Sequence, residues 1–162
     1  MVSFISLISR SDKPLYIQSF LPTSNDPATA NEFLKFNFLS HMGLDVFSSP
    51  TSLTLREQQQ QHQKNQGVAP IYLLLFIHDG ISVYGYETNN GLKILVGSEA
   101  PETTDRLNQL FLKIHKCYLR AVCNPFNGGV EDADESIENS ATFDRNLKQV
   151  VAQWSSHDAE AD

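Results

Sequence analysis

The residues that could do chemistry do not gather into a catalytic group. His78 and Asp79 are neighbours in the chain, and adjacent side chains on a strand point to opposite faces. Gly80 follows them, and Asp-Gly is a pair that tolerates the positive φ of a tight hairpin turn. We therefore predict a turn at this position and not an acid–base pair.

The cysteines and the other histidines are no stronger candidates. Cys117 and Cys123 are six residues apart on one predicted helix, a rise of about 9 Å that prevents a disulfide without unwinding. Cys117 falls near the apolar stripe of that helix, which favours a buried thiol. The scattered histidines, which do not have metal-ligand spacing, are His41, His62, His115 and His157. Since phosphate-binding loops and dinucleotide fingerprints are also missing, we predict no enzyme, no cofactor and no metal.

The composition is that of one acidic domain. The chain has 162 residues, of which 41% are hydrophobic, which suffices for a single core. Its formal net charge is -7, and nucleic-acid or anionic-lipid binding needs clustered Lys and Arg, so neither partner is expected. No apolar run reaches the roughly 18 residues of a membrane span, and the start of the chain lacks the pattern of a secretory signal. Together with two free thiols, this predicts a cytoplasmic protein without direct membrane insertion.

Five strands are predicted, in two groups. Residues 2–8 are apolar at odd and even positions, which is typical of a strand covered on both faces, and residues 15–20 form its hairpin partner. The turn between them contains Asp12, for which we favour a structural role. Strands over 71–78, 81–87 and 92–97 follow, and two hairpin sequences separate them: His78-Asp79-Gly80 and Thr88-Asn89-Asn90-Gly91.

Three helices complete the prediction. The first covers residues 28–47, and the second begins near Pro101 and ends before Pro125, which disfavours helical geometry in the preceding residue. The third covers 142–154, with Ser140 or Thr142 as its cap. Residues 48–68 include four consecutive glutamines and no apolar period, so we predict a mobile insertion there, and a disordered tail over 155–162.

The predicted order is β-β-α-β-β-β-α-α, in a single domain over residues 1–154. Two hairpin-linked groups would form one five-stranded antiparallel sheet, with one helix on one face and two on the other. This α/β (α+β) arrangement is the longin, or profilin-like, layout.

Several strings spread along the chain carry a family resemblance. They are Ser11-Asp12-Lys13-Pro14-Leu15-Tyr16-Ile17, Leu34-Lys35-Phe36-Asn37, Ser40-His41-Met42-Gly43-Leu44-Asp45-Val46-Phe47, Gly85-Tyr86 with Thr88-Asn89, Cys123-Asn124-Pro125-Phe126, and Ser140 with Phe143 and Asp144. In order and spacing these strings resemble the sedlin-like family of TRAPP subunits, and within it the subunit 2-like branch. The Gln-rich insertion and the tail depart from the family pattern.

The resemblance implies a non-enzymatic subunit of TRAPP, a cytosolic complex that tethers vesicles and activates Rab-type GTPases. It implies a role in complex assembly during ER-to-Golgi or intra-Golgi traffic, with a peripheral location at the Golgi and ER-derived vesicles. The expected partners are other TRAPP subunits and, indirectly, a Rab-type GTPase. The alternative is a longin-type SNARE or an adaptor-complex small subunit, but a SNARE needs a heptad helix and an anchor, and neither follows before Asp162.

Surplus apolar surface indicates where a partner binds. On a helical wheel the first helix has one apolar arc and a second, nearly opposite arc. The first arc contains Leu34, Phe38, Leu39, Met42 and Val46. Contiguous exposed apolar patches mark contact sites, while the alternative is that a loop covers the extra arc as additional core. We predict partner binding by the second arc, above all by its Phe36 and Phe47, and by two leucines away from the main stripe of the next helix. These residues are Phe33, Phe36, Leu44, Phe47, Leu112 and Leu119.

Asp45 is a further predicted partner-binding residue. A carboxylate near a helix C-terminus faces the negative end of the helix dipole, which costs about 0.3–1 kcal/mol unless a donor pairs with it. We therefore predict a donor for Asp45. The donor is either the backbone of the following loop or, as the family match at Leu44-Asp45 implies, part of a subunit-binding surface, and both readings stay open.

Two charged or exposed motifs have a structural alternative that we favour. Asn124-Pro125-Phe126 has the form of an exposed tripeptide ligand for an endocytic adaptor, but it lies where a helix ends, so we predict that Phe126 folds back over that end. The acidic residues between positions 131 and 138 favour a solvated loop over a basic partner.

Overall fold

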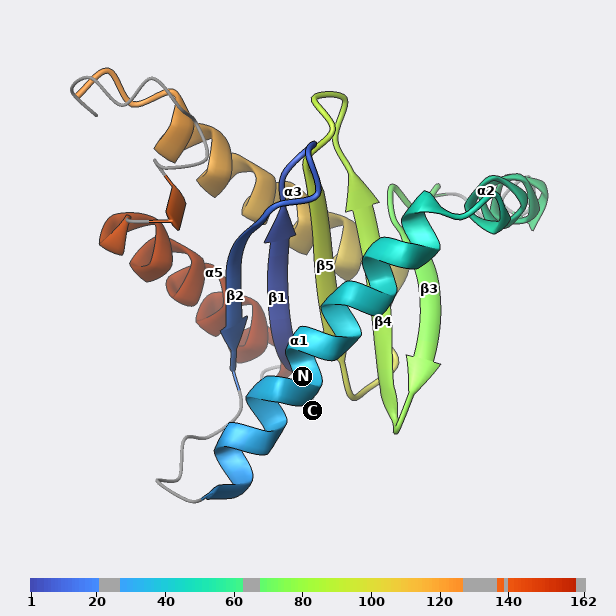
Figure 1. Ribbon diagram of the computed structural model, residues 1–162, viewed down its shortest axis with the longest axis horizontal. Helices are drawn as coiled ribbons and strands as arrows, with labels where there is room; N and C mark the ends of the chain where they lie inside the picture. Colours follow the sequence, from blue (N-terminus) through green and yellow to red (C-terminus); the bar gives the residue numbers. More distant parts are fainter. Residues whose placement is uncertain (21–26, 63–67, 127–136, 139, 160–162) are drawn as a thin grey trace.

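A five-stranded antiparallel sheet separates two layers of helices. In the computed structural model the described residues are 1–20, 27–62, 68–126, 137–138 and 140–159. Helix α1 crosses one face of the sheet, and α3 and α5 cover the other (Figure 1). The sheet order is β2-β1-β5-β4-β3. The elements are β1 (Val2–Ile8), β2 (Pro14–Ser19), α1 (Pro27–Ser48), α2 (Thr51–His62), β3 (Leu73–His78), β4 (Ile81–Glu87), β5 (Lys93–Ser98), α3 (Thr104–Val122) and α5 (Ala141–Ala159).

The predicted layout is confirmed, because the two hairpin groups meet in the middle of one sheet. β1 pairs with β2 on one side and with β5 on the other, and all seven of its residues are buried. A strand in this position has a helix layer on each face, which explains its apolar residues at odd and even positions. The first and last strands of the chain thus become neighbours, and β3 and β2 become the two edges.

The turns also have the predicted backbone. Asp79 and Gly80 join β3 to β4 with φ values of 52° and 76°, as a two-residue hairpin turn requires. Asp12 has a φ of 64°, and its backbone N–H donates to the carbonyl of Ser9 within the β1–β2 turn. The structural role predicted for Asp12 is therefore confirmed, and Lys93 adds an ion pair to its carboxylate.

Most of the face of α1 that packs on the sheet is not the predicted one, although Leu39 of the predicted arc is buried. Phe36 is 1% exposed and Phe47 is 9% exposed, whereas Leu34 is 66% and Phe38 is 57% exposed. The buried side of the helix also includes Gly43, where a Cβ would lie 3.1 Å from the Leu95 side chain. Because both arcs of α1 are apolar, hydrophobicity alone does not choose between them, and close approach at the glycine does.

The core beneath α1 is built from aromatic rings that fill the space above strand glycines. Phe36 stacks on Phe4 with ring centroids 5.1 Å apart. A Cβ at Gly97 would come within 2.3 Å of the Phe4 ring, and one at Gly85 within 2.4 Å of the Phe47 ring. Phe36 and Phe47 therefore belong to the interior, and the prediction that they form an exposed docking surface is wrong.

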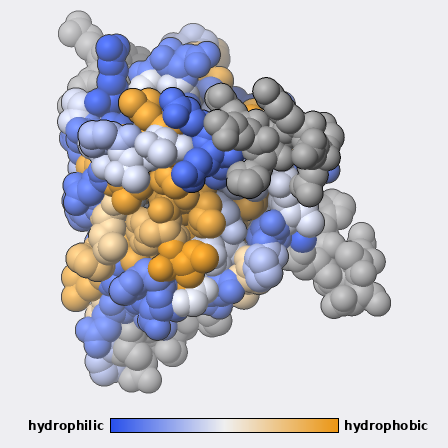
Figure 2. Space-filling view, turned by 90° about the vertical axis from the view of Figure 1, so that its right-hand side faces the viewer, coloured by the Kyte–Doolittle hydropathy of each residue, from blue (hydrophilic) through white to orange (hydrophobic). Residues whose placement is uncertain are grey.

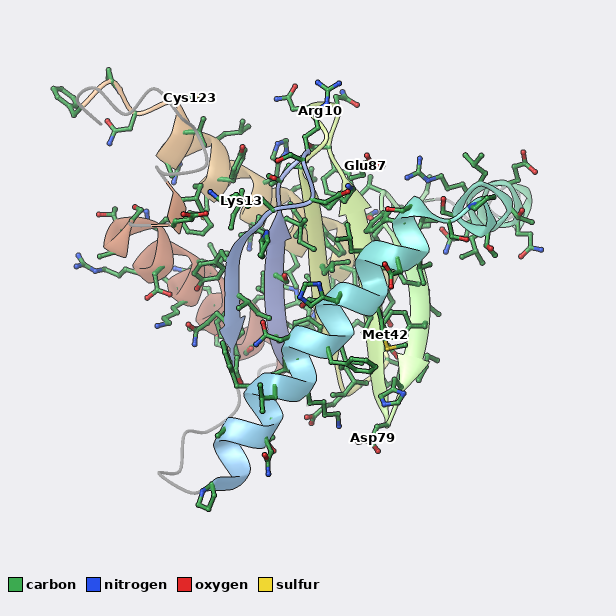
Figure 3. The ribbon with its side chains drawn as sticks, viewed as in Figure 1. Arg10, Lys13, Met42, Asp79, Glu87 and Cys123 are labelled. Carbon is green, nitrogen blue, oxygen red and sulfur yellow. The ribbon has the colours of Figure 1, made fainter. Side chains whose placement is uncertain are left out.

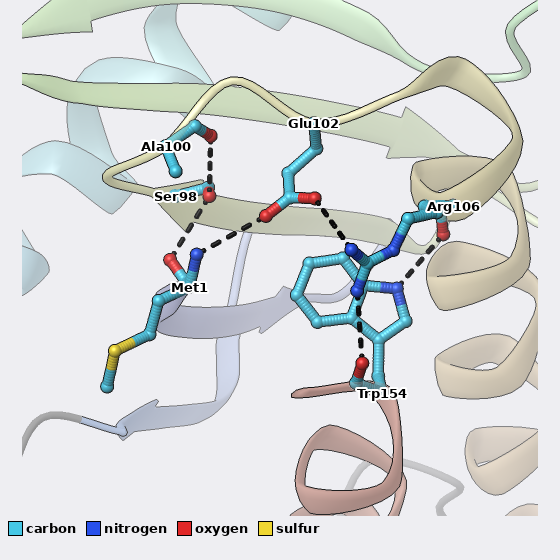
Figure 4. A network of polar contacts seen from close by, with 6 residues as sticks. All are labelled: Met1, Ser98, Ala100, Glu102, Arg106 and Trp154. Carbon is cyan, nitrogen blue, oxygen red and sulfur yellow. Dashed lines mark hydrogen bonds and ion pairs between the residues drawn. The ribbon is translucent and has the colours of Figure 1, made fainter. Parts of the chain in front are cut away.

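The opposite core is held partly by a reciprocal contact between α3 and α5. The guanidinium of Arg106 lies 4.5 Å from the centroid of the Trp154 ring and donates to the Trp154 carbonyl at 3.1 Å. The indole Nε1 of Trp154 donates back to the carbonyl of Arg106 at 3.2 Å. Glu102 accepts from the amino group of Met1 and forms an ion pair with Arg106, so the network also reaches β1 (Figure 4).

Two segments differ from the predicted irregular structure. Thr51–His62, the first half of the insertion predicted over 48–68, forms helix α2, which extends beyond the β3 edge of the sheet (Figure 1). Glutamine is a good helix former, so a segment without apolar periodicity still becomes helical next to a packed element. At the other end, α5 continues through residues 155–159 of the predicted tail. Residues 63–67 and 160–162 lie outside the described residues.

Candidate protein-docking surfaces

The residues predicted to bind a partner are spread over three environments. Phe36 and Phe47 lie in the core, and Leu44 is partly buried against the same cluster. Phe33 is 44% exposed, on the same helix. Leu112 and Leu119 of α3 are 53% and 38% exposed, on the opposite side of the sheet. The structure thus does not bring the predicted set together into one surface.

A different apolar surface lies along the β3 edge of the sheet. Figure 2 shows a continuous hydrophobic area on this side of the molecule. Helix α1 contributes a row of apolar side chains spaced four residues apart. Figure 3 labels one of them, Met42, which points toward β3 and β4. We call this hydrophobic area the β3-edge surface, and its residues are Phe38, Met42, Val46, Ile71, Phe76 and Ile77.

The most exposed members of this surface come from both elements. Phe38 is 57% exposed and Ile77 is 65% exposed, while Met42 and Val46 are partly buried against the core below α1. Phe76 pairs with buried Val83, and the next residue, Ile77, pairs with Ser82. The side chains of Phe76 and Ile77 therefore point to opposite faces of the sheet. The apolar side chains therefore lie on both sides of the β3 backbone, as a surface does when a partner covers the edge itself.

The β3 backbone adds hydrogen-bonding groups to this surface. β3 is at the end of the sheet order, and no described strand pairs with its outer side. Edge strands that avoid association usually carry charged side chains or proline within the strand, but β3 reads Leu-Leu-Leu-Phe-Ile-His. An open, apolar edge is the arrangement that accepts an added strand from another protein.

Charged pairs mark the two ends of the surface. At the β3–β4 turn, Lys35 of α1 forms an ion pair with Asp79 and holds the pKa of that carboxyl below its usual value. At the other end an open hollow of about 380 Å³ lies between α2 and the start of β3. Arg56 and Glu87 line it and form an ion pair at 3.0 Å. The surface is thus apolar in its middle and polar at its rim, like a protein–protein interface.

Asp45 does not have the predicted donor within the described residues. Its side chain is exposed, and the described part of the chain offers it no hydrogen bond and no ion pair. Water can therefore solvate the carboxylate, which removes most of the cost of its position near the end of α1.

The Asn-Pro-Phe motif also differs from the prediction. Phe126 is 91% exposed and does not fold back over the end of α3. Its backbone N–H donates to Oδ1 of Asn124 at 3.0 Å, so the side chain of Asn124 closes the turn that displays the ring. The acidic loop over 131–136 lies outside the described residues.

The titratable groups with shifted pKa values are structural. Burial raises the pKa of the Cys117 thiol, despite Arg120 and Lys116 nearby, and burial lowers the pKa of His115. Burial and the Asp144 carboxylate raise the pKa of Tyr16, whose hydroxyl donates to Asp144 Oδ1 at 2.7 Å. Within the described ranges no three His, Cys, Asp or Glu residues gather as metal ligands.

The N-terminus of α5 resolves the choice between the two predicted caps. Phe143 N–H donates to Ser140 Oγ at 3.1 Å, so Ser140, and not Thr142, caps α5.

Among the described helices, none combines the length and the apolar character needed to cross a bilayer.

Comparison with known proteins decides the family. The sedlin family model matches residues 7–153. This chain belongs to the sedlin family. The recognition made from the short strings is therefore confirmed over most of the chain, from the end of β1 through most of α5.

The relatives carry names from membrane trafficking. The chain is 30% identical over 146 residues to the trafficking protein particle complex subunit 2-like protein of Xenopus tropicalis, covering 88% of this chain and 95% of that protein. It is 34% identical over 144 residues to the TRAPP-associated protein TCA17 of Saccharomyces cerevisiae, covering 83% of this chain and 87% of that protein.

A solved structure supports the fold alone. A chain in the structure of the mammalian SRP receptor aligns with a TM-score of 0.50 at 13% identity, and the alignment covers 98% of each chain. At this identity the similarity concerns the arrangement of the longin-like layers and not what the two chains bind.

Proposed function

We propose that this protein is a non-enzymatic subunit of a TRAPP-type vesicle-tethering complex and that it binds a neighbouring subunit through the β3-edge surface. The names of its relatives support the complex. The open apolar edge supports the mode of action, since an exposed patch of this kind is stabilised when a second protein covers it. In this role the protein supports assembly of the complex, and thereby activation of a Rab-type GTPase at Golgi and ER-derived membranes.

The β3-edge surface carries this proposal better than the residues expected from the sequence. Phe36 and Phe47 are already buried in the monomer, so a partner would gain nothing from them without unfolding α1. Burying a side chain such as Phe38 or Ile77 contributes roughly 1.5–3 kcal/mol. The backbone edge of β3 then fixes the orientation of the partner through main-chain hydrogen bonds.

The test is affinity purification of the tagged full chain from cells of its own organism, followed by quantitative mass spectrometry. We expect the wild-type chain to co-purify with the other TRAPP subunits, and the double variant Phe38→Asp and Ile77→Asp to lose them at least roughly tenfold. Phe33→Asp is the matched control, because Phe33 lies on the same helix, away from Phe38, and is also exposed.

The two parts of the proposal fail differently. If the wild-type chain brings down no TRAPP subunit, membership of the complex is wrong. If the double variant melts at the wild-type temperature and still assembles, while Phe33→Asp does not, the surface is wrong and the original prediction for Phe33 is favoured.

A further inference from the structure

The outer face of α3 is an exposed surface that the β3-edge proposal does not use. Its residues follow the helical row opposite the core, and each is exposed: Leu112, Lys113, Lys116, Leu119 and Arg120. Leu112 and Leu119 are separated by two turns of helix, about 10.5 Å. The core side of the same helix is formed by Leu107, Leu110, Phe111, Ile114 and Cys117.

The charge of this face is opposite to that of the rest of the chain. Residues 109–123 contain three of the 12 Lys and Arg residues and none of the 19 Asp and Glu residues. No ion pair joins Lys113, Lys116 or Arg120 to another residue within the described part of the chain. Because the other nine basic residues are outnumbered by 19 acidic ones, an acidic ligand is repelled elsewhere and attracted here.

Phe126, four residues after the end of α3, adds an exposed apolar ring beyond this helix. α3 ends at Val122, and the backbone N–H of Cys123 still donates to the Leu119 carbonyl at 2.8 Å. Asn124 and Pro125 then hold Phe126 in a closed turn just beyond the helix end. A ring that is 91% exposed on a preformed turn contributes little to the fold, and it binds with a small loss of conformational entropy.

We propose that the outer face of α3 and Phe126 form a second docking surface, for an acidic amphipathic segment of a partner protein. The apolar side of the segment covers Leu112, Leu119 and Phe126, and its carboxylates pair with Lys113, Lys116 and Arg120. A membrane is the less favourable occupant, since polybasic lipid-binding segments carry roughly four to eight cations and this chain is acidic overall.

This surface is separate from the β3-edge surface. Figure 3 places Cys123, at the end of α3, far from Met42 and Asp79, which mark the β3 edge. Helix α1, which contributes to the β3-edge surface, and helix α3 also lie on opposite faces of the sheet (Figure 1). One protein can therefore hold two partners at once, and the second contact does not depend on the first.

The test measures binding of the full chain to synthetic amphipathic peptides. The probe has leucines seven residues apart and glutamates at the flanking positions, and the matched peptide has lysine at every glutamate. We expect the acidic peptide to bind and the lysine peptide not to bind. The double variant Lys116→Glu and Arg120→Glu should weaken binding by roughly tenfold or more, and Phe126→Ala by roughly tenfold.

Arg10→Glu is the control, because it changes a single exposed charge on the β1–β2 turn. It should leave the affinity unchanged, and raising the salt concentration should weaken the wild-type complex. The proposal is overturned if both peptides bind equally, or if the double variant binds as well as the wild type. It is also overturned if phosphatidylserine-containing vesicles bind this face and the acidic peptide does not.

Discussion

The ring of Phe47 lies directly on the backbone of Gly85, so closely that a Cβ on the glycine would be 2.4 Å from the ring carbons Cε2 and Cζ. Phe47 is in the last turn of α1, and Gly85 is in the middle of β4. The absence of one side chain on the strand thus creates the space that another side chain on the helix fills. This contact holds the C-terminal part of α1 on the sheet and sets which side of the helix faces solvent.

Gly85→Ala is therefore expected to destabilise the protein. The added methyl group meets the Phe47 ring and, at 2.9 Å, Cδ1 of Leu75, so one of them has to move. Overpacking of this kind lowers the free energy of unfolding by about 1–3 kcal/mol. Urea denaturation followed by circular dichroism measures the loss.

Gly43→Ala is the control for this substitution. Its Cβ would lie 3.1 Å from the two methyl groups of Leu95, which rotate more easily than a ring, and alanine favours the helix by about 1 kcal/mol. We expect a smaller loss than for Gly85→Ala. Equal stability of Gly85→Ala and the wild type would contradict the packing described here.

Phe36 and Phe38 are expected to respond in opposite ways to truncation. Phe36 is 1% exposed and Phe38 is 57% exposed, although only one residue separates them on α1. Phe36→Ala leaves a cavity above β1 and should lower the free energy of unfolding by about 3–5 kcal/mol. Phe38→Ala should change it by no more than about 0.5 kcal/mol.

The same denaturation experiment distinguishes the two possible orientations of α1. If Phe38→Ala lowers the free energy of unfolding more than Phe36→Ala does, the arc that contains Phe38 is the buried one. In that case the co-purification assay should also reverse: substitution of Phe36 should abolish partner binding, and substitution of Phe38 should leave it unchanged.

The hydrogen bond from Tyr16 to Asp144 is expected to make stability depend on pH. Burial would raise the pKa of Asp144, but hydrogen bonds from Lys148 and Tyr16 outweigh it and hold the pKa below its ordinary value of 3.8. A carboxyl with a lowered pKa stabilises the folded state above that ordinary value, and this contribution is lost as the pH falls through the folded-state pKa.

Tyr16→Phe should therefore lower the free energy of unfolding by about 0.5–1.5 kcal/mol at neutral pH, and the difference should shrink below about pH 4. Tyr86→Phe is the control, because the described residues give the Tyr86 hydroxyl no hydrogen-bond partner, and its effect should not vary with pH. A Tyr16→Phe effect that stays constant or grows in acid would show that the lowered pKa of Asp144 does not depend on this bond.

Much of the fold follows from short-range features of the sequence. The hairpin turn at Asp79-Gly80 depends on two residues that accept positive φ, and the burial of β1 is visible in its unbroken apolar run. The stripe of α3, including Leu107 and Ile114, has the period of a helix with one apolar face. Each of these patterns has a single low-energy interpretation, and the family strings lie within the same elements.

The candidate docking surfaces could not be predicted from the sequence alone, because they depend on how the elements are arranged in three dimensions. The β3 edge exists only because β1 inserts between β2 and β5 and leaves β3 at the end of the sheet. Leu112 and Leu119 were correctly expected to be exposed, since they lie opposite a clear stripe. For Phe126, the sequence analysis predicted that the ring covers the helix end, and this is wrong, because the turn closed by Asn124 leaves the ring exposed.

The amino-acid sequence by itself thus determined the sheet, its turns, the three main helices and the family. Only the tertiary structure decided which side of α1 is buried, because both of its arcs are apolar and the choice depends on contacts with Gly85 and Leu95, far away in the chain. Local periodicity reports how many apolar faces a helix has. Which of them meets the sheet depends on where small residues let two backbones approach.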